Sequence, residues 1–227
     1  MGGKNFITSR KYITTMPEIH IFSDVEEAVS LLKEYKKTLI RGEMTKEQIV
    51  RKSVSSNIFR AFHNLSKNPS LIYREWASSN IDEIIQKLNI IETKQEYDKQ
   101  LFKWVYSFID YWDSQVKNPN DRIIIGPASK MINLLIKMLN ESKYLSNDKI
   151  VQFFNVPFDE FTLKPLVNII NLISDVKYRI DIPKNPTMKY ISTPELYWII
   201  QNAVFKLCRK AGISPILYDY WCWNEKH

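Results

Sequence analysis

The chain carries two neighbouring runs, DRIIIGPASKMINLLIKMLN at residues 121–140 and NVPFDEFTLKPL at residues 155–166. The first run predicts a tight turn at Gly126-Pro127 and then an amphipathic helix, because its apolar residues recur at helical spacing. The apolar arc holds Met131, Ile132, Leu135, Ile136 and Leu139. The opposite side of the helix holds Lys130, Asn133, Lys137 and Asn140. The second run places Asp159 at the start of the next helix, so this stretch predicts consecutive helices headed by a lysine and an aspartate.

Helix signals continue outward from this stretch in both directions. Only 5 of the 227 residues are glycine, which favours long helices joined by short turns. Helices are expected at residues 45–62, 94–116, 159–174 and 193–211, with another starting at Asn80. The aromatic residues in 94–116 are expected to lie in the core. The sequence therefore predicts an all-α protein.

We divide the predicted protein into an arm and one domain. Residues 1–22 are mostly polar and show no helical period, so we expect an N-terminal arm there. Residues 23–227 would form a single helical domain with two lobes, at about 23–116 and 117–227.

The composition restricts the classes of function. A formal net charge of +7 suits a polyanionic partner, although many basic proteins bind no nucleic acid. The 2 cysteines and 3 scattered histidines give no zinc or iron–sulfur pattern, so we expect no metal and no cofactor. Cys208 and Cys222 are expected to be buried thiols of a cytoplasmic protein. No apolar run approaches membrane-spanning length, and no signal peptide is recognisable.

The lysine and the aspartate of the central stretch each allow two interpretations. The polar side of the 121–140 helix is either a solvated stripe or a site headed by Lys130. Asp159 is either a helix N-cap or a carboxylate that stabilises positive charge on a sugar, and the two roles are compatible. In the functional interpretation, backbone amides at Gly126, Ala128 and Ser129 bind DNA phosphate at the helix start.

The stretch resembles the archaeal 8-oxoguanine DNA glycosylases, a branch of the helix-hairpin-helix DNA glycosylase superfamily. The match comprises a hairpin glycine at Gly126, then Lys130, then Lys137 just before Leu139-Asn140, and then Pro157-Phe158-Asp159. Near the C-terminus, Gly212-Ile213-Ser214-Pro215-Ile216 followed by Asp219 and Trp223 is similar in order and spacing. The resemblance covers roughly residues 120–223, and residues 1–115 show no match.

The resemblance implies a helix-hairpin-helix fold, whose two lobes enclose a cleft, and an enzyme of base excision repair. Lys130 would attack the anomeric carbon and form a Schiff base that supports abasic-site lyase activity, while Asp159 assists proton transfer. Lys137, Asp219 and Trp223 would form the pocket for a flipped modified base such as 8-oxoguanine. The implied partner is double-stranded DNA at the nucleoid, bound by a monomer.

Three alternatives stay open from the sequence. The chain could be a non-catalytic helix-hairpin-helix DNA-binding protein in which Lys130 and Asp159 are structural. It could also be a glycosylase acting on modified bases of phage DNA. A metal-dependent nuclease would need clustered carboxylates, which the sequence does not display.

Overall fold

The computed structural model describes residues 19–35, 42–59, 62, 65, 67–177 and 179–224. These ranges contain helices and no β-strand, which confirms the all-α class. The α-helices are α1 (Val25–Glu34), α2 (Lys46–Ser53), α3 (Ser56–Phe59), α4 (Pro69–Ile90), α5 (Lys94–Gln115), α6 (Ile125–Asn140), α7 (Glu160–Leu163), α8 (Ile170–Ile173), α9 (Pro194–Ala211) and α10 (Pro215–Asn224). The 3-10 helices are η2 (Pro119–Asp121), η3 (Asp148–Phe153), η4 (Lys164–Leu166) and η5 (Met188–Tyr190).

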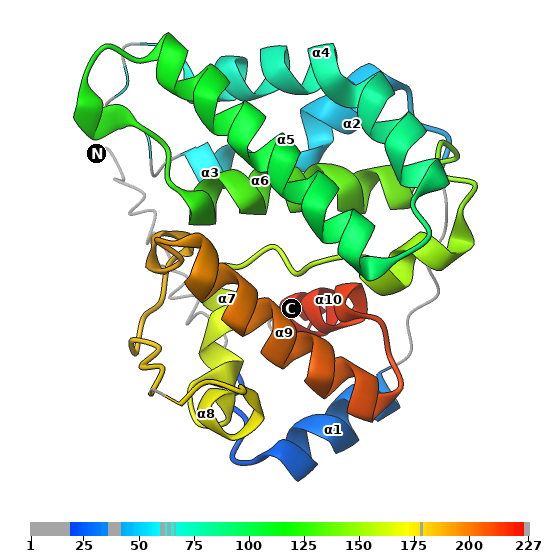
Figure 1. The fold of residues 1–227 in the computed structure, drawn as a ribbon, viewed down its shortest axis with the longest axis vertical. Helices are drawn as coiled ribbons and strands as arrows, with labels where there is room; N and C mark the ends of the chain where they lie inside the picture. The colour runs from blue at the N-terminus through cyan, green and yellow to red at the C-terminus, as the bar shows by residue number, and fades with distance from the viewer. Residues whose placement is uncertain are drawn as a thin grey trace, which may run out of the picture.

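Helix α6 lies at the centre of the arrangement. Figure 1 shows α2 to α6 on one side of the molecule and α1 with α7 to α10 on the other. Helix α6 packs against α2, α5, α9 and η5, whereas α1 packs against α9. The predicted division near residue 116 therefore does not follow the packing, because it separates α6 from α5 and α1 from α9. Sequence order alone could not reveal that α1 packs against α9, or that α6 packs against α5.

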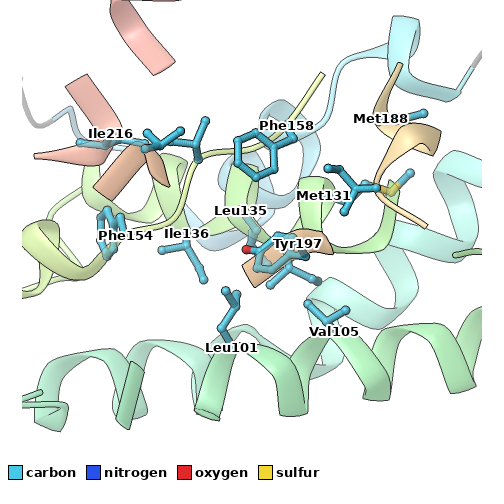
Figure 2. Packing of buried hydrophobic residues seen from close by; sticks show 14 of the residues in the cluster. Leu101, Val105, Met131, Leu135, Ile136, Phe154, Phe158, Met188, Tyr197 and Ile216 are labelled. Carbon is cyan, nitrogen blue, oxygen red and sulfur yellow. The ribbon is translucent and has the colours of Figure 1, made fainter. Parts of the chain in front are cut away.

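The core between α5 and α6 is apolar and closely packed. Leu101 and Val105 of α5 face Leu135 and Ile136 of α6, as Figure 2 shows. Most aromatic residues of α5 are buried as predicted, with Phe108 and Trp112 fully inaccessible, whereas Tyr106 is 46% exposed. Helix α5 begins where Thr93 and Glu96 form a capping box, which satisfies otherwise unpaired amides at the start of the helix. The core thus holds α6 firmly from the side opposite to its lysines.

The predicted helix ends are confirmed in some places and wrong in others. Helix α9 starts after the N-cap Thr193 and ends at Gly212, which has the left-handed φ of 69° that glycine adopts readily. The helix expected at 45–62 breaks at the extended Val54. The helix expected at 159–174 is three short pieces, interrupted where η4 contains Pro165. Asn80 starts no helix, since it lies in the middle of α4.

Residue 22, the last residue of the predicted arm, is packed against the helices. Residues 1–18 lie outside the described part of the chain. Phe22 is fully buried, stacks on Trp221 with ring centroids 4.9 Å apart, and donates its amide to the carbonyl of Pro165 at 3.2 Å. Residue 22 is therefore part of the folded domain. None of the helices that the structure describes is both long enough and apolar enough to cross a membrane.

Candidate active site

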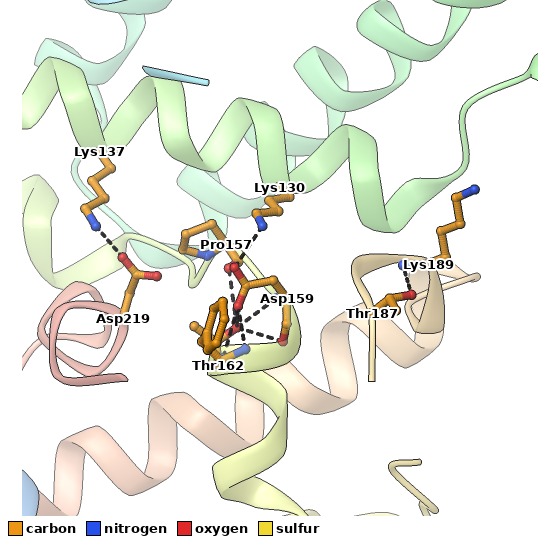
Figure 3. A network of polar contacts seen from close by, with 9 residues as sticks. Lys130, Lys137, Pro157, Asp159, Thr162, Thr187, Lys189 and Asp219 are labelled. Carbon is orange, nitrogen blue, oxygen red and sulfur yellow. Dashed lines mark hydrogen bonds and ion pairs between the residues drawn. The ribbon is translucent and has the colours of Figure 1, made fainter. Parts of the chain in front are cut away.

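Lys130 lies in the second turn of α6 and forms a buried ion pair. Its ammonium donates a hydrogen bond to Oδ2 of Asp159 at 2.8 Å, and the two side chains are only 8% and 10% exposed. Figure 3 shows Lys130 pointing from α6 toward the start of α7, where Asp159 lies. Residues 29 positions apart in the chain are thus brought together. The two predicted catalytic groups meet, as the sequence interpretation required.

Asp159 is held in its orientation by the helix that it caps. Its Oδ1 accepts the backbone amides of Phe161 at 2.9 Å and Thr162 at 3.1 Å, which makes it the N-cap of α7. In return, the hydroxyl of Thr162 accepts the amide of Asp159 at 2.8 Å. One carboxylate oxygen therefore serves the backbone and the other faces Lys130. The N-cap role and the ion-pair role coexist, each on its own oxygen.

The pair lies on the wall of a pocket of about 690 Å³ between the two sides of the molecule. This volume is within the range of small-molecule sites, about 300–1,000 Å³. Helix α6 contributes Lys130 and Leu134 to the wall, and the region of α7 contributes Asp159 and Phe161. Trp223 of α10 lines the same pocket and packs on Phe161 with ring centroids 4.8 Å apart. The predicted pocket residue Trp223 therefore lies beside the predicted catalytic pair.

Lys137 and Asp219 lie elsewhere and pair with each other. Figure 3 shows Lys137 pointing from α6 to Asp219 of α10, to one side of the Lys130–Asp159 pair. Neither Lys137 nor Asp219 lines the pocket. The Lys137 ammonium also lies 3.8 Å from the ring centroid of Tyr220. The predicted base-pocket role of these two residues therefore has no support from their placement.

The Asp219 carboxylate is in an unusual environment. It is fully buried, and its Oδ1 has no hydrogen-bond partner within the described part of the chain. Burial raises the pKa of Asp219 above its ordinary value, and the ammonium of Lys137 opposes this shift. The pair is therefore buried and lies outside the pocket that Lys130 lines.

The turn predicted at Gly126-Pro127 is wrong, because α6 already begins at Ile125. Gly126 and Ala128 are buried, as is Ser129, whose hydroxyl donates to the carbonyl of Gly126 at 3.1 Å. The amide of Ala128 donates to the carbonyl of Ile124 at 3.2 Å. The three residues predicted to bind DNA phosphate therefore form a packed helix start instead of an exposed hairpin.

The polar side of α6 is not a solvated stripe, which corrects the alternative interpretation. Lys130, Asn133 and Asn140 are 7%, 2% and 4% exposed. Asn133 donates its amide to the hydroxyl of Tyr197 on α9 at 3.0 Å. The polar residues face the other half of the molecule, because α6 is covered on both sides.

Sequence reasoning missed the wall formed by the α2–α3 junction. Lys52, Ser55 and Asn57 line the pocket from there, and their side chains have no ion pair or hydrogen bond within the described residues. Thr187 and Met188 line it from η5 and the residue before it. A clue existed in the sequence: the run SVSS at 53–56 favours side-chain hydrogen bonds that compete with a continuous helix.

No three histidine, cysteine, aspartate or glutamate side chains of the described ranges cluster closely enough to hold a metal ion. Comparison of the chain with family models, with curated proteins and with solved structures finds no match.

Proposed function

We propose that the protein is a DNA glycosylase that excises a modified base from a nucleotide flipped into the Lys130 pocket, with associated abasic-site lyase activity. The observation that carries the proposal is the Lys130–Asp159 pair, 2.8 Å apart on the wall of a pocket of about 690 Å³. An amine can attack the anomeric carbon as a nucleophile once the adjacent carboxylate has accepted its proton. The aromatic wall of Phe161 and Trp223 offers faces against which a base can stack.

The proposed reaction starts with transfer of a proton from the Lys130 ammonium to Asp159. The nitrogen lone pair then forms a bond to C1′ of the deoxyribose, and the glycosidic bond breaks. The base leaves with the bonding electrons and takes up the proton held by Asp159, which returns to its carboxylate form. Positive charge that develops on the sugar is stabilised by the Asp159 carboxylate, whose direction is fixed by two backbone amides.

The lyase step follows from the same covalent bond. Opening of the sugar ring converts the adduct into a protonated imine between Lys130 and C1′. The Asp159 carboxylate then accepts a proton from C2′, and the C3′–O bond to the phosphate breaks, which leaves a double bond between C2′ and C3′ and cuts the strand. Hydrolysis of the imine returns the free amine.

We assign α6 and its surroundings to the helix-hairpin-helix glycosylase class, with a cleft between two lobes. The position of the pocket supports this, since α2, α3 and α6 contribute to its wall from one side of the molecule, and α7 and α10 contribute from the other. An oxidised purine in cellular DNA is the proposed substrate, and a modified base of phage DNA would use the same chemistry.

The test is excision from duplexes that each carry one modified base, with strand nicking scored before and after alkali. We expect one class of modified base to be released, with some strands nicked without alkali. The non-catalytic alternative predicts a gel shift with no release of any base. Nicking of unmodified DNA that EDTA abolishes would instead indicate a metal-dependent nuclease.

A further inference from the structure

The segment around η5 closes over the start of α6. A Cβ atom at Gly126 would lie 1.9 Å from the carbonyl oxygen of Met188 and 2.7 Å from that of Ile191. Real Cβ atoms do not approach backbone oxygen so closely, so a residue larger than glycine at position 126 would prevent this segment from packing there. The first turn of α6 is therefore covered by the very segment that follows Pro186.

The docked segment forms part of the pocket and carries an exposed cation next to it. Pro186, Thr187 and Met188 line the pocket, and Lys189 is the next residue. Lys189 is exposed, and its ammonium lies 5.7 Å from the ring centroid of Phe62. No carboxylate in the described part of the chain forms an ion pair with Lys189. Figure 3 shows its side chain pointing away from the Asp159 network.

A second cation comes from the α2–α3 side. Lys52, in the last turn of α2, lines the pocket and is exposed, without an ion pair among the described residues. The acidic neighbour on the wall, Glu160, lies 3.9 Å from Lys164 on its own side. Lys52 thus lies on the pocket wall, and Lys189 directly follows a residue of that wall, each without an ion pair among the described residues. Such groups suit phosphates, because each phosphate contact releases condensed counterions.

We propose that Lys189 and Lys52 hold the DNA backbone at the pocket, and that the docked segment replaces the hairpin expected at Gly126. The inference rests on the proposed function for the identity of the polyanion. Lysine contacts of this kind position a strand without reading its sequence. The segment that buries Gly126 thereby supplies the phosphate contact that the buried amides cannot make.

The test measures the salt dependence of binding to a duplex that carries a tetrahydrofuran abasic analogue. Fluorescence anisotropy gives the dissociation constant of the full chain at several salt concentrations. The variants are Lys189→Gln, Lys52→Gln and the double variant. Lys103→Gln is the matched control, since Lys103 is exposed on α5 and does not line the pocket.

Each lost phosphate contact should reduce the slope of log K against log salt by about 0.9, and the double variant should lose about twice that. The control should keep the wild-type slope. An unchanged slope in the double variant, or an equal loss in the control, would overturn the inference. Wild-type protein that binds with these slopes but never forms a covalent adduct with abasic DNA would refute the proposed catalysis and leave the backbone contact standing.

Discussion

Substitution of Gly126 tests how the site is assembled, because its surroundings predict a definite cost. An added methyl group would meet the carbonyl oxygens of Met188 and Ile191 at 1.9 Å and 2.7 Å. These are backbone atoms, so no side-chain rotation relieves the overlap, and overpacking of this kind costs about 3 kcal/mol. Alanine also favours a helix interior over glycine by about 1 kcal/mol. We therefore expect Gly126→Ala to lower the free energy of unfolding by about 2 kcal/mol.

Gly42→Ala is the matched control for this prediction. No atom lies within 4 Å of an added Cβ at Gly42, and its φ is not positive. Alanine there should leave stability unchanged or raise it by about 0.5 kcal/mol, since it restricts the unfolded chain. Urea unfolding followed by fluorescence of the 6 tryptophans gives both values. Equal midpoints for the two variants would refute the docking of η5 on α6.

Three further substitutions probe charge and backbone conformation. Asp159→Asn keeps a capping side chain but leaves Lys130 buried without a counter-charge, so unfolding measurements should show a loss of about 3 kcal/mol; a loss below about 1 kcal/mol would mean that the pair is solvated. Burial raises the pKa of Asp219, so the native state binds the extra proton and wild-type stability should fall as pH rises from about 4 to the raised native value. Asp219→Asn should not show this fall, and identical pH profiles would contradict it. Gly212→Ala should cost about 1 kcal/mol in thermal unfolding despite open space around it, because φ is 69°.

The helices were predictable where local signals decide them. Thr93 with Glu96 and Thr193 with Pro194 mark helix starts through capping that involves only neighbours in the chain. The apolar period of α6 likewise predicted its core face correctly. Breaks were harder, because Val54 and the short pieces after Asp159 depend on tertiary packing as well as on local propensity.

The sequence predicted which residues form the candidate site, but it did not predict what surrounds them. The sequence placed Lys130 and Asp159 at adjacent helix starts, and the structure pairs them at 2.8 Å. It could not show that α6 is covered on both sides, so a buried polar stripe resembled a solvated one. Nor could it show that a segment about 60 residues downstream would pack on Gly126. Contacts between distant segments, which the sequence does not display locally, decide both points.

If the Lys130 amine bonds to the anomeric carbon of a nucleotide in DNA, an imine forms between the protein and the sugar. Borohydride reduces the imine that such a bond produces, so incubation with a duplex containing a true abasic site should trap a covalent protein–DNA complex. We expect trapping by the wild-type protein and by Lys103→Gln, and none by Lys130→Gln. Undiminished trapping by Lys130→Gln, or no trapping by the wild-type protein at saturating concentration, would contradict the assignment of Lys130 as the nucleophile.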